Sequence, residues 1–420
     1  MAMNKLLTAL IIVFTLLITS DFANAQDKND WKFNGHFQLR TELDGRDFND
    51  LTHPVSFSSL RTRLGVQKQV NDDLLFNVQL SDSRILGGTQ NTLAQAGNLD
   101  LHQAYVKLKD PFGIPINLQA GRFEMSYGTQ RFIGAVGWHY VGRSFDGARA
   151  SFKAYFDIDV FATTHSEFVG YIGNPKPDDY AANYGNSEIR YSMYGFWAQK
   201  QVCEYQKIDL FAFNDRDRGA DLNRYTLGLN HFGTFGKLST IVEAGYQMGT
   251  MGNTDIAAYL VSAQAKYNLG VLSAGAGFDM LSGNDPEEES YNAFLTNYGT
   301  NHKFYGFMDY FINIPGNTGN MGLNDAYVML NYNPKDSKFK FGANFHLFMT
   351  NQSNAADENA LGNELDLTIK YMFTKGTAIV WGGSIFMPGD LMKNKPGTEG
   401  FSFGEDNAFW TYIMISTSIN

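Results

Sequence analysis

The sequence predicts an all-β fold, a transmembrane antiparallel β-barrel. Three observations support it. Long stretches alternate apolar and polar residues, short turns alternate with long polar connections, and beyond the N-terminal segment no stretch has the roughly 18 consecutive apolar residues of a membrane helix. The composition agrees, because aromatic residues make up 15% of the chain, glycines number 42 and charged residues are only 18%. Such a balance is typical of strands joined by many turns.

The N-terminal segment predicts export. An apolar run covers residues 6–18, and residues 23–25 (Ala-Asn-Ala) form a small-x-small cleavage site. The run is too short to span a membrane, so 1–25 is predicted to be a secretory signal peptide and 26–420 the barrel domain. The single cysteine, Cys203, cannot form an internal disulfide, so the exported chain must be stabilised by other means.

Period-2 alternation runs through the mature chain. In residues 33–43 every second residue is Phe, Gly, Leu or Thr, and the residues between them are Asn, His, Gln, Arg and Glu. The pattern recurs over 60–67, 76–81, 339–347, 364–373 and 409–419. The predicted strands run roughly nine to twelve residues, close to the 9–11 that a strand tilted about 45° needs to cross a bilayer. Their apolar faces end in Phe, Tyr or Trp, as membrane barrels do, whereas a long soluble β-helix, the alternative, would show a short fixed repeat.

Turn signals set the strand count. Short turns are predicted at 71–73, 153–155, 203–204, 235–237, 268–270, 334–337 and 374–376, and longer polar connections at 45–57, 85–98, 125–144, 166–190, 214–222, 249–255, 283–322, 351–362 and 387–407. They divide the chain into about eighteen strands, an even number, with short periplasmic turns and long extracellular loops. A barrel of that size is too wide for wall side chains to fill, so an aqueous lumen is expected.

Arginine is concentrated in the first third of the chain. Residues 26–150 hold nine of the thirteen arginines, with 14 basic against 13 acidic side chains, whereas residues 151–420 hold 18 against 29. The formal net charge of −10 therefore comes from the later part of the chain. Arginine presents a planar fork that fits carboxylates, and rings of Arg or Lys are how pores favour anions.

The candidate pore-lining, anion-selective residues share this cationic third of the chain. They are Arg40, Arg61 and Arg63 on polar strand faces, and Arg84, Arg122, Arg131, Arg143 and Arg149 at strand ends or on the Gly-rich stretch 121–149. The alternative is that individual arginines pair with Glu42, Asp82, Glu124 or Asp146 and only brace the wall.

Other chemistries are not supported. The histidines are scattered without a His-x-x-x-His pair or a cysteine pair, so no metal site and no cofactor is expected. Ser81, Ser83 and His102 could meet on neighbouring strands, but this is too weak a signal for a hydrolase, and no catalytic residue is predicted. The acidic run 285–289 is either solvated or a Ca²⁺ loop. The acidic balance argues against nucleic acid.

The longest connection, 283–322, exceeds what a compact barrel needs. Either it folds inward and narrows the pore, with its aromatic residues facing solute, or it stands outside and anchors at the membrane interface. A partly structured lid is the favoured interpretation.

Several runs resemble the alginate-export outer-membrane channel family. They are SLRTRLGVQ (59–67), VQLSDSR (78–84), NLDLHQAYVKL (98–108), LQAGRFEMSYGTQRFIG (118–134) and GRSFDGAR (142–149). The resemblance covers most of the mature chain and implies an eighteen-stranded barrel with an electropositive constriction that selects an anionic polyuronate. By resemblance, the constriction residues are all the candidate arginines except Arg40.

Two functions follow as hypotheses. The first is a passive channel in the Gram-negative outer membrane, surrounded by lipid and lipopolysaccharide, for small polar or anionic solutes such as uronate oligosaccharides or an exported alginate-type polyuronate. The second is a non-conducting barrel that acts in adhesion or as a scaffold for a periplasmic partner. The first is favoured.

Overall fold

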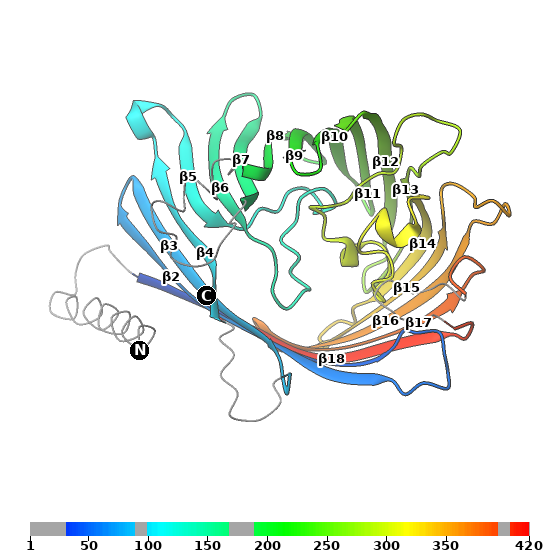
Figure 1. Ribbon diagram of the computed structural model, residues 1–420. Helices are drawn as coiled ribbons and strands as arrows, with labels where there is room; N and C mark the ends of the chain where they lie inside the picture. The colour runs from blue at the N-terminus through cyan, green and yellow to red at the C-terminus, as the bar shows by residue number, and fades with distance from the viewer. Residues whose placement is uncertain (1–30, 89–98, 168–188, 394–403, 420) are drawn as a thin grey trace, which may run out of the picture.

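The computed structural model describes residues 31–88, 99–167, 189–393 and 404–419, so the predicted signal peptide 1–25 lies outside the described residues. Within these ranges eighteen strands form one closed antiparallel sheet, as predicted (Figure 1). Each strand pairs with its neighbours in sequence, and the barrel closes where β1 pairs with β18. The described residues contain no helix long and apolar enough to span a membrane.

The strands differ widely in length. They are β1 Trp31–Gly45, β2 Val55–Asn71, β3 Leu74–Ile85, β4 Leu99–Lys109, β5 Asn117–Phe123, β6 Phe145–Lys153, β7 Asp157–Glu167, β8 Ile189–Cys203, β9 Gln206–Asp217, β10 Leu222–Phe235, β11 Leu238–Met251, β12 Thr254–Asn268, β13 Leu272–Leu281, β14 Leu323–Tyr332, β15 Phe339–Met349, β16 Ala360–Thr374, β17 Thr377–Pro388 and β18 Ala408–Ile419. Short 3₁₀ turns lie at Pro111–Gly113 (η1), Asn301–Lys303 (η2) and Gly316–Thr318 (η3).

The two faces of the wall differ as the alternation predicted. On β2, Leu64 is 66% exposed on the outside, whereas Arg61 and Arg63 on the other face are 4% and 8% exposed. Exposed aromatic residues gather at both ends of the outer face: Phe235, Tyr267, Tyr332, Phe339 and Phe373 near the short turns, and Tyr194, Tyr225, Tyr246, Tyr259 and Phe409 near the other end. An apolar belt between aromatic girdles is what a lipid bilayer requires of a barrel.

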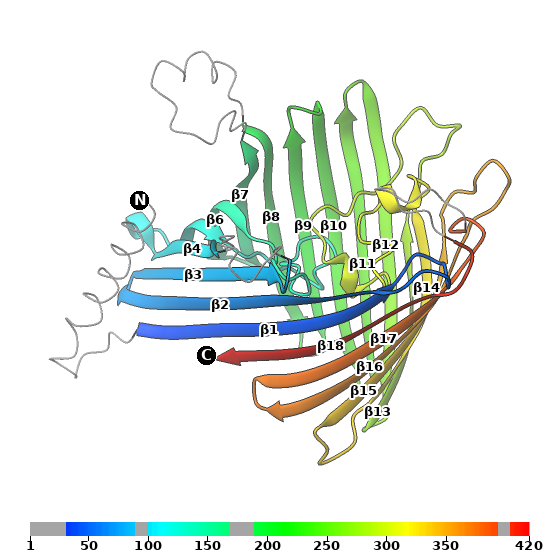
Figure 2. The same ribbon diagram turned by 60° about the horizontal axis from the view of Figure 1, so that its bottom comes forward.

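The expected connections are mostly confirmed, with two corrections. Residues 249–255 were expected to form a long connection, but β11 and β12 are joined by a two-residue turn, Gly252 and Asn253. Likewise, most of 214–222 lies within β9 and β10. Strands β9–β12 continue as long ribbons through the segments that were interpreted as loops from the sequence (Figure 2). Asp215 of β9, within the segment expected to be a loop, pairs with Arg224 of β10 at 2.8 Å.

Two long loops fold into the lumen rather than away from it: the β5–β6 loop (residues 124–144) and the β13–β14 loop (residues 282–322) (Figure 1). Phe132 of the first loop packs on Phe211 of the inner wall, with ring centroids 4.5 Å apart. Phe311 of the second loop packs on Phe348 of β15 at 4.7 Å. The loops therefore supply the core that the wall alone cannot fill.

The inside–outside assignment is testable on β14. Val328 is 55% exposed at the middle of this strand, so Val328→Lys should destabilise the barrel by about 2–4 kcal/mol, the cost of a cation at the bilayer midplane. Urea unfolding of the protein refolded into lipid vesicles measures this cost. The neighbouring change Met329→Lys is the control, because that side chain faces the lumen, where water can solvate the ammonium group. A larger loss for Met329→Lys would mean that the faces are reversed.

Candidate functional site

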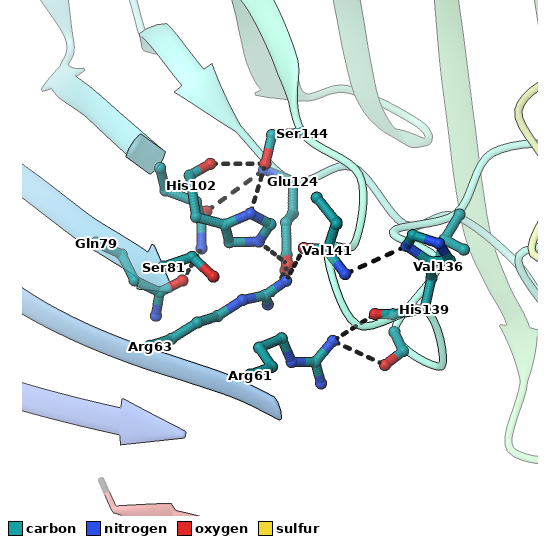
Figure 3. A network of polar contacts seen from close by, with 12 residues as sticks. Arg61, Arg63, Gln79, Ser81, His102, Glu124, Val136, His139, Val141 and Ser144 are labelled. Atoms are coloured by element: carbon teal, nitrogen blue, oxygen red, sulfur yellow. Dashed lines mark hydrogen bonds and ion pairs between the residues drawn. The ribbon is translucent and has the colours of Figure 1, made fainter. Parts of the chain in front are cut away.

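Arg61 and Arg63 extend into the lumen from β2. They alternate along the extended strand with outer-face residues such as Leu64, so both guanidinium groups lie on the inner face. Arg61 donates from Nη1 to the backbone oxygens of Gly137 (3.0 Å) and His139 (2.9 Å). It thereby holds the tip of the β5–β6 loop against the wall (Figure 3).

Arg63 binds the same loop at two further points. Its Nη2 donates to the backbone oxygen of Val141 at 2.8 Å, and its Nη1 donates to Oε1 of Glu124 at 3.1 Å. Burial raises the pKa of Glu124, but the hydrogen bonds and charges of His102 and Arg63 lower it by more, so this pKa lies below its usual value. Glu124 is therefore an ionised partner of Arg63.

Arg40 of β1 connects the two inner loops. Its Nε donates to Oε1 of Glu42 at 2.7 Å and its Nη1 to the backbone oxygen of Trp138 at 2.9 Å. The guanidinium group also lies 4.0 Å from the centre of the Trp138 ring, and that ring stacks on His302 of the β13–β14 loop at 4.2 Å. Such cation–π and stacking contacts favour one arrangement of the loops over others.

Arg131 extends from the β5–β6 loop toward β11 and β13 rather than toward β1 and β2. Its side chain is buried, with 3% of the residue surface exposed. It donates to Glu243 of β11 at 2.9 Å, to Asp279 of β13 at 2.8 Å and to the hydroxyl of Tyr305 at 3.0 Å. One arginine therefore balances two buried carboxylates, and it links the loop to the acidic wall of the barrel.

Arg143 joins the two inner loops through backbone groups. Its guanidinium donates to the backbone oxygen of Gly134 (3.2 Å) and to those of residues 297–299 (2.5–3.2 Å). Burial lowers the pKa of Arg143 from its usual value. In the wall beside the loop, Arg149 donates to Gln119 at 2.7 Å and lies 3.5 Å from Asp159.

Arg84 does not line the lumen, which corrects the expectation from the sequence. On β3, Ser81 and Ser83 face inward, so Arg84 shares the outer face with Leu80, which pairs across strands with the exposed Leu64. Arg84 binds its outer-face neighbour Asp82, with 2.6 Å between Nε and Oδ1. The pattern near the strand end left this parity unresolved.

Arg122 is a second correction. Gln119 of the same strand is buried against the inner Arg149, so Arg122, three residues further on, belongs to the opposite, outer face. It pairs at 2.9 Å with Asp146 of β6, and both side chains are substantially exposed. The candidate arginines therefore divide into six on the lumen side and these two outside.

The bracing interpretation holds for most of the arginines. Within the described ranges, Arg61 and Arg143 bind only carbonyl and amide oxygens, whereas the other candidates each have a carboxylate partner. No sequence pattern pointed to Glu243 or Asp279 as partners, because they lie 112 and 148 residues from Arg131.

A closed antiparallel barrel with an apolar outer belt and loops folded into its lumen defines a porin-type outer-membrane protein. Residues 31–403 match the family model described as alginate export, and the chain belongs to that family. It is accordingly a channel-type protein of the Gram-negative outer membrane, in contact with lipid and lipopolysaccharide, and not an enzyme.

Solved structures share the fold. OccAB4 of Acinetobacter baumannii is 13% identical, covers 94% of this chain and 99% of its own, and has a TM-score of 0.60. OpdO of Pseudomonas aeruginosa is 13% identical, with 92% and 97% covered and a TM-score of 0.61. OpdK of Pseudomonas aeruginosa, solved with vanillate, is 11% identical, with 92% and 98% covered and a TM-score of 0.58. No curated protein matches the sequence.

The Arg131 cluster should dominate the stability of the inner loops. Arg131→Gln leaves two buried carboxylates without a counter-charge and should cost about 3–5 kcal/mol of unfolding free energy. Denaturant unfolding in detergent measures it. Arg122→Gln is the matched control, since it breaks a largely exposed pair and should cost no more than about 1 kcal/mol. Equal losses for both variants would contradict the assignment of Arg131 as the buried brace.

Proposed function

We propose that the barrel is a passive outer-membrane channel for small anionic or polar solutes, and that the β5–β6 loop forms its constriction. The observation that supports this most directly is the set of hydrogen-bond partners of Arg61 and Arg143. Both guanidinium groups bind neutral oxygens of Gln38 or of the inner loops, so among the described residues they are positive charges without a carboxylate partner.

These charges act on a solute through their field rather than by direct contact. Arg61 is 4% exposed and lies behind the backbone of the loop tip. Charges in a partly desolvated setting are screened less than those at an open surface, so a buried guanidinium still raises the potential in the nearby water. Lys303 of the β13–β14 loop is exposed and donates to the backbone oxygen of Thr129 at 2.8 Å, which adds a further cation to the inner loops.

Carboxylated solutes fit this field best. The family is named for export of alginate, a polyuronate, and one structure of the same fold was solved with vanillate, which also carries a carboxylate. Uronate oligosaccharides or an alginate-type chain are the solute classes that we propose for this channel. The pairing of most arginines with carboxylates limits the net positive charge, which favours short oligomers or monomers over a long polyanion.

One observation favours the alternative of a non-conducting barrel with an adhesive or scaffolding role. The large aromatic side chains Phe294, Tyr305 and Phe311 of the β13–β14 loop are at most 2% exposed inside the lumen. Loops packed this densely narrow any path through the barrel. Single-channel recording in planar bilayers separates the two functions, since a scaffold gives no unitary conductance.

Selectivity tests the proposed role of the arginines. The double variant Arg61→Gln/Arg143→Gln should lower the anion preference in reversal-potential measurements across a salt gradient, because it removes the two positive charges that lack carboxylate partners. The difference from wild type should shrink in 1 M salt, where the Debye length falls to about 3 Å.

The matched control is Arg84→Gln/Arg122→Gln, which removes the same number of charges from the outer face. This control should leave the reversal potential near that of wild type. A wild-type channel that prefers cations, or a control that changes selectivity as much as the lumen variant, would overturn the proposal.

A further inference from the structure

A histidine of the wall contacts both ends of the β5–β6 loop. Glu124 is the first residue after β5 and Ser144 the last before β6. His102 of β4, 5% exposed, lies between them: its Nε2 is 2.7 Å from Oε1 of Glu124 and its Nδ1 is 3.2 Å from Oγ of Ser144 (Figure 3). We refer to His102, Glu124 and Ser144 as the His102 clamp.

The hydrogen atoms in the clamp can be assigned from its partners. Ser144 has one hydroxyl hydrogen, and Oγ lies 2.6 Å from the backbone oxygen of His102, an atom that can only accept. The Ser144 oxygen therefore accepts from Nδ1, while the ionised Glu124 accepts from Nε2. In this arrangement each ring nitrogen contacts one end of the loop, so the ring holds the two ends together.

This assignment excludes a catalytic interpretation of the same three residues. A serine, a histidine and a carboxylate in contact suggest a hydrolytic triad, but a triad requires the serine to donate its proton to the imidazole. Here that proton is directed to a carbonyl. Nor do the two serines singled out in the sequence serve as nucleophiles for His102: Ser81 contacts Ser83 at 3.3 Å, and Ser83 donates to the backbone oxygen of Tyr140 at 2.8 Å.

The returning end of the loop is closely fitted to the clamp. Gly142 has φ of +81°, a conformation that disfavours side chains, and a Cβ there would lie 2.4 Å from Nη2 of Arg63 and 3.4 Å from the His102 ring. Arg63 in turn shares Glu124 with His102. Loop entry, loop exit and wall therefore meet at one hydrogen-bonded cluster, Arg63–Glu124–His102.

We propose that His102 is a positioning residue that keeps the β5–β6 loop folded across the lumen by fixing its two ends. Arg40 and Arg61 bind the tip of the loop, and Arg63 binds Glu124 only alongside His102, so loss of His102 should loosen both ends while the barrel itself stays intact. The inference deepens the proposed function, since it makes a residue remote from the loop tip a determinant of the constriction.

Hydrogen–deuterium exchange tests the proposal on the full-length protein in detergent. The reporters are the backbone amides of residues 135–143, including that of Arg143, which donates to the backbone oxygen of Ala135 at 2.8 Å. In His102→Phe these amides should exchange about tenfold faster, as loss of charge-assisted hydrogen bonds predicts, with strand amides unchanged. His102→Gln keeps a single donor and should give a smaller increase.

His231→Phe is the matched control. His231 lies on β10 within the same barrel, on the face of the strand opposite the buried Thr226 and Asn230, and so faces away from the lumen. It should leave the exchange of residues 135–143 at the wild-type rate. Equal exchange in wild type and His102→Phe, or an equal increase in both phenylalanine variants, would overturn the clamp.

The exchange readout does not depend on what the channel conducts. If wild type conducts without anion preference but His102→Phe still loosens the loop, the selectivity proposal fails and the clamp stands. In planar bilayers, a freed loop should also give larger fluctuations of the open-channel current in His102→Phe than in His231→Phe. A quiet current that matches the control would contradict the inference even if the barrel is fully folded.

Discussion

The structure depends on how an irregular loop satisfies its backbone inside a membrane barrel. A loop that leaves the wall and crosses the lumen loses the hydrogen bonds of the sheet, and each buried carbonyl without a donor costs free energy. Guanidinium groups supply that donor here. Arg61, Arg63 and Arg143 all donate to backbone oxygens of the two inner loops, and one arginine can serve several carbonyls because it presents five N–H groups.

This requirement explains why arginine is concentrated in an otherwise acidic chain. Strands β1 and β2 face the loop tip and carry its donors, while the loop itself carries Arg131 and Arg143 toward the remaining wall and the second inner loop. The acidic excess of the later strands provides the complement: Glu243 and Asp279 would be unpaired buried charges without Arg131. The positive loop and the negative wall therefore pack against each other as complementary charges. The proposed selectivity depends on the arginines that have no carboxylate partner.

Much of the fold could be predicted because strand alternation is a local property. The alternation places Leu64 toward lipid and Arg63 toward the lumen from neighbouring residues alone. The faces of Arg84 and Arg122 could not be assigned so easily, because both lie near strand ends, where the alternation of apolar and polar residues is less regular. Inward folding of 283–322 was one of two alternatives, and the sequence could not choose between them because the choice depends on contacts such as Arg131 with Tyr305, which no local pattern records.

The strength of the contacts along the β5–β6 loop suggests which part can move. Its ends are tied to the wall by ionised groups at Glu124, and its middle by the buried Arg131, which meets two carboxylates. The tip, by contrast, is bound through backbone carbonyls, where a guanidinium can exchange its partner for water at small cost. His139 and Val141 at this tip have exposed side chains. The tip is therefore the part of the loop that can shift at least cost, while the ends and the buried brace hold the rest of the loop in place.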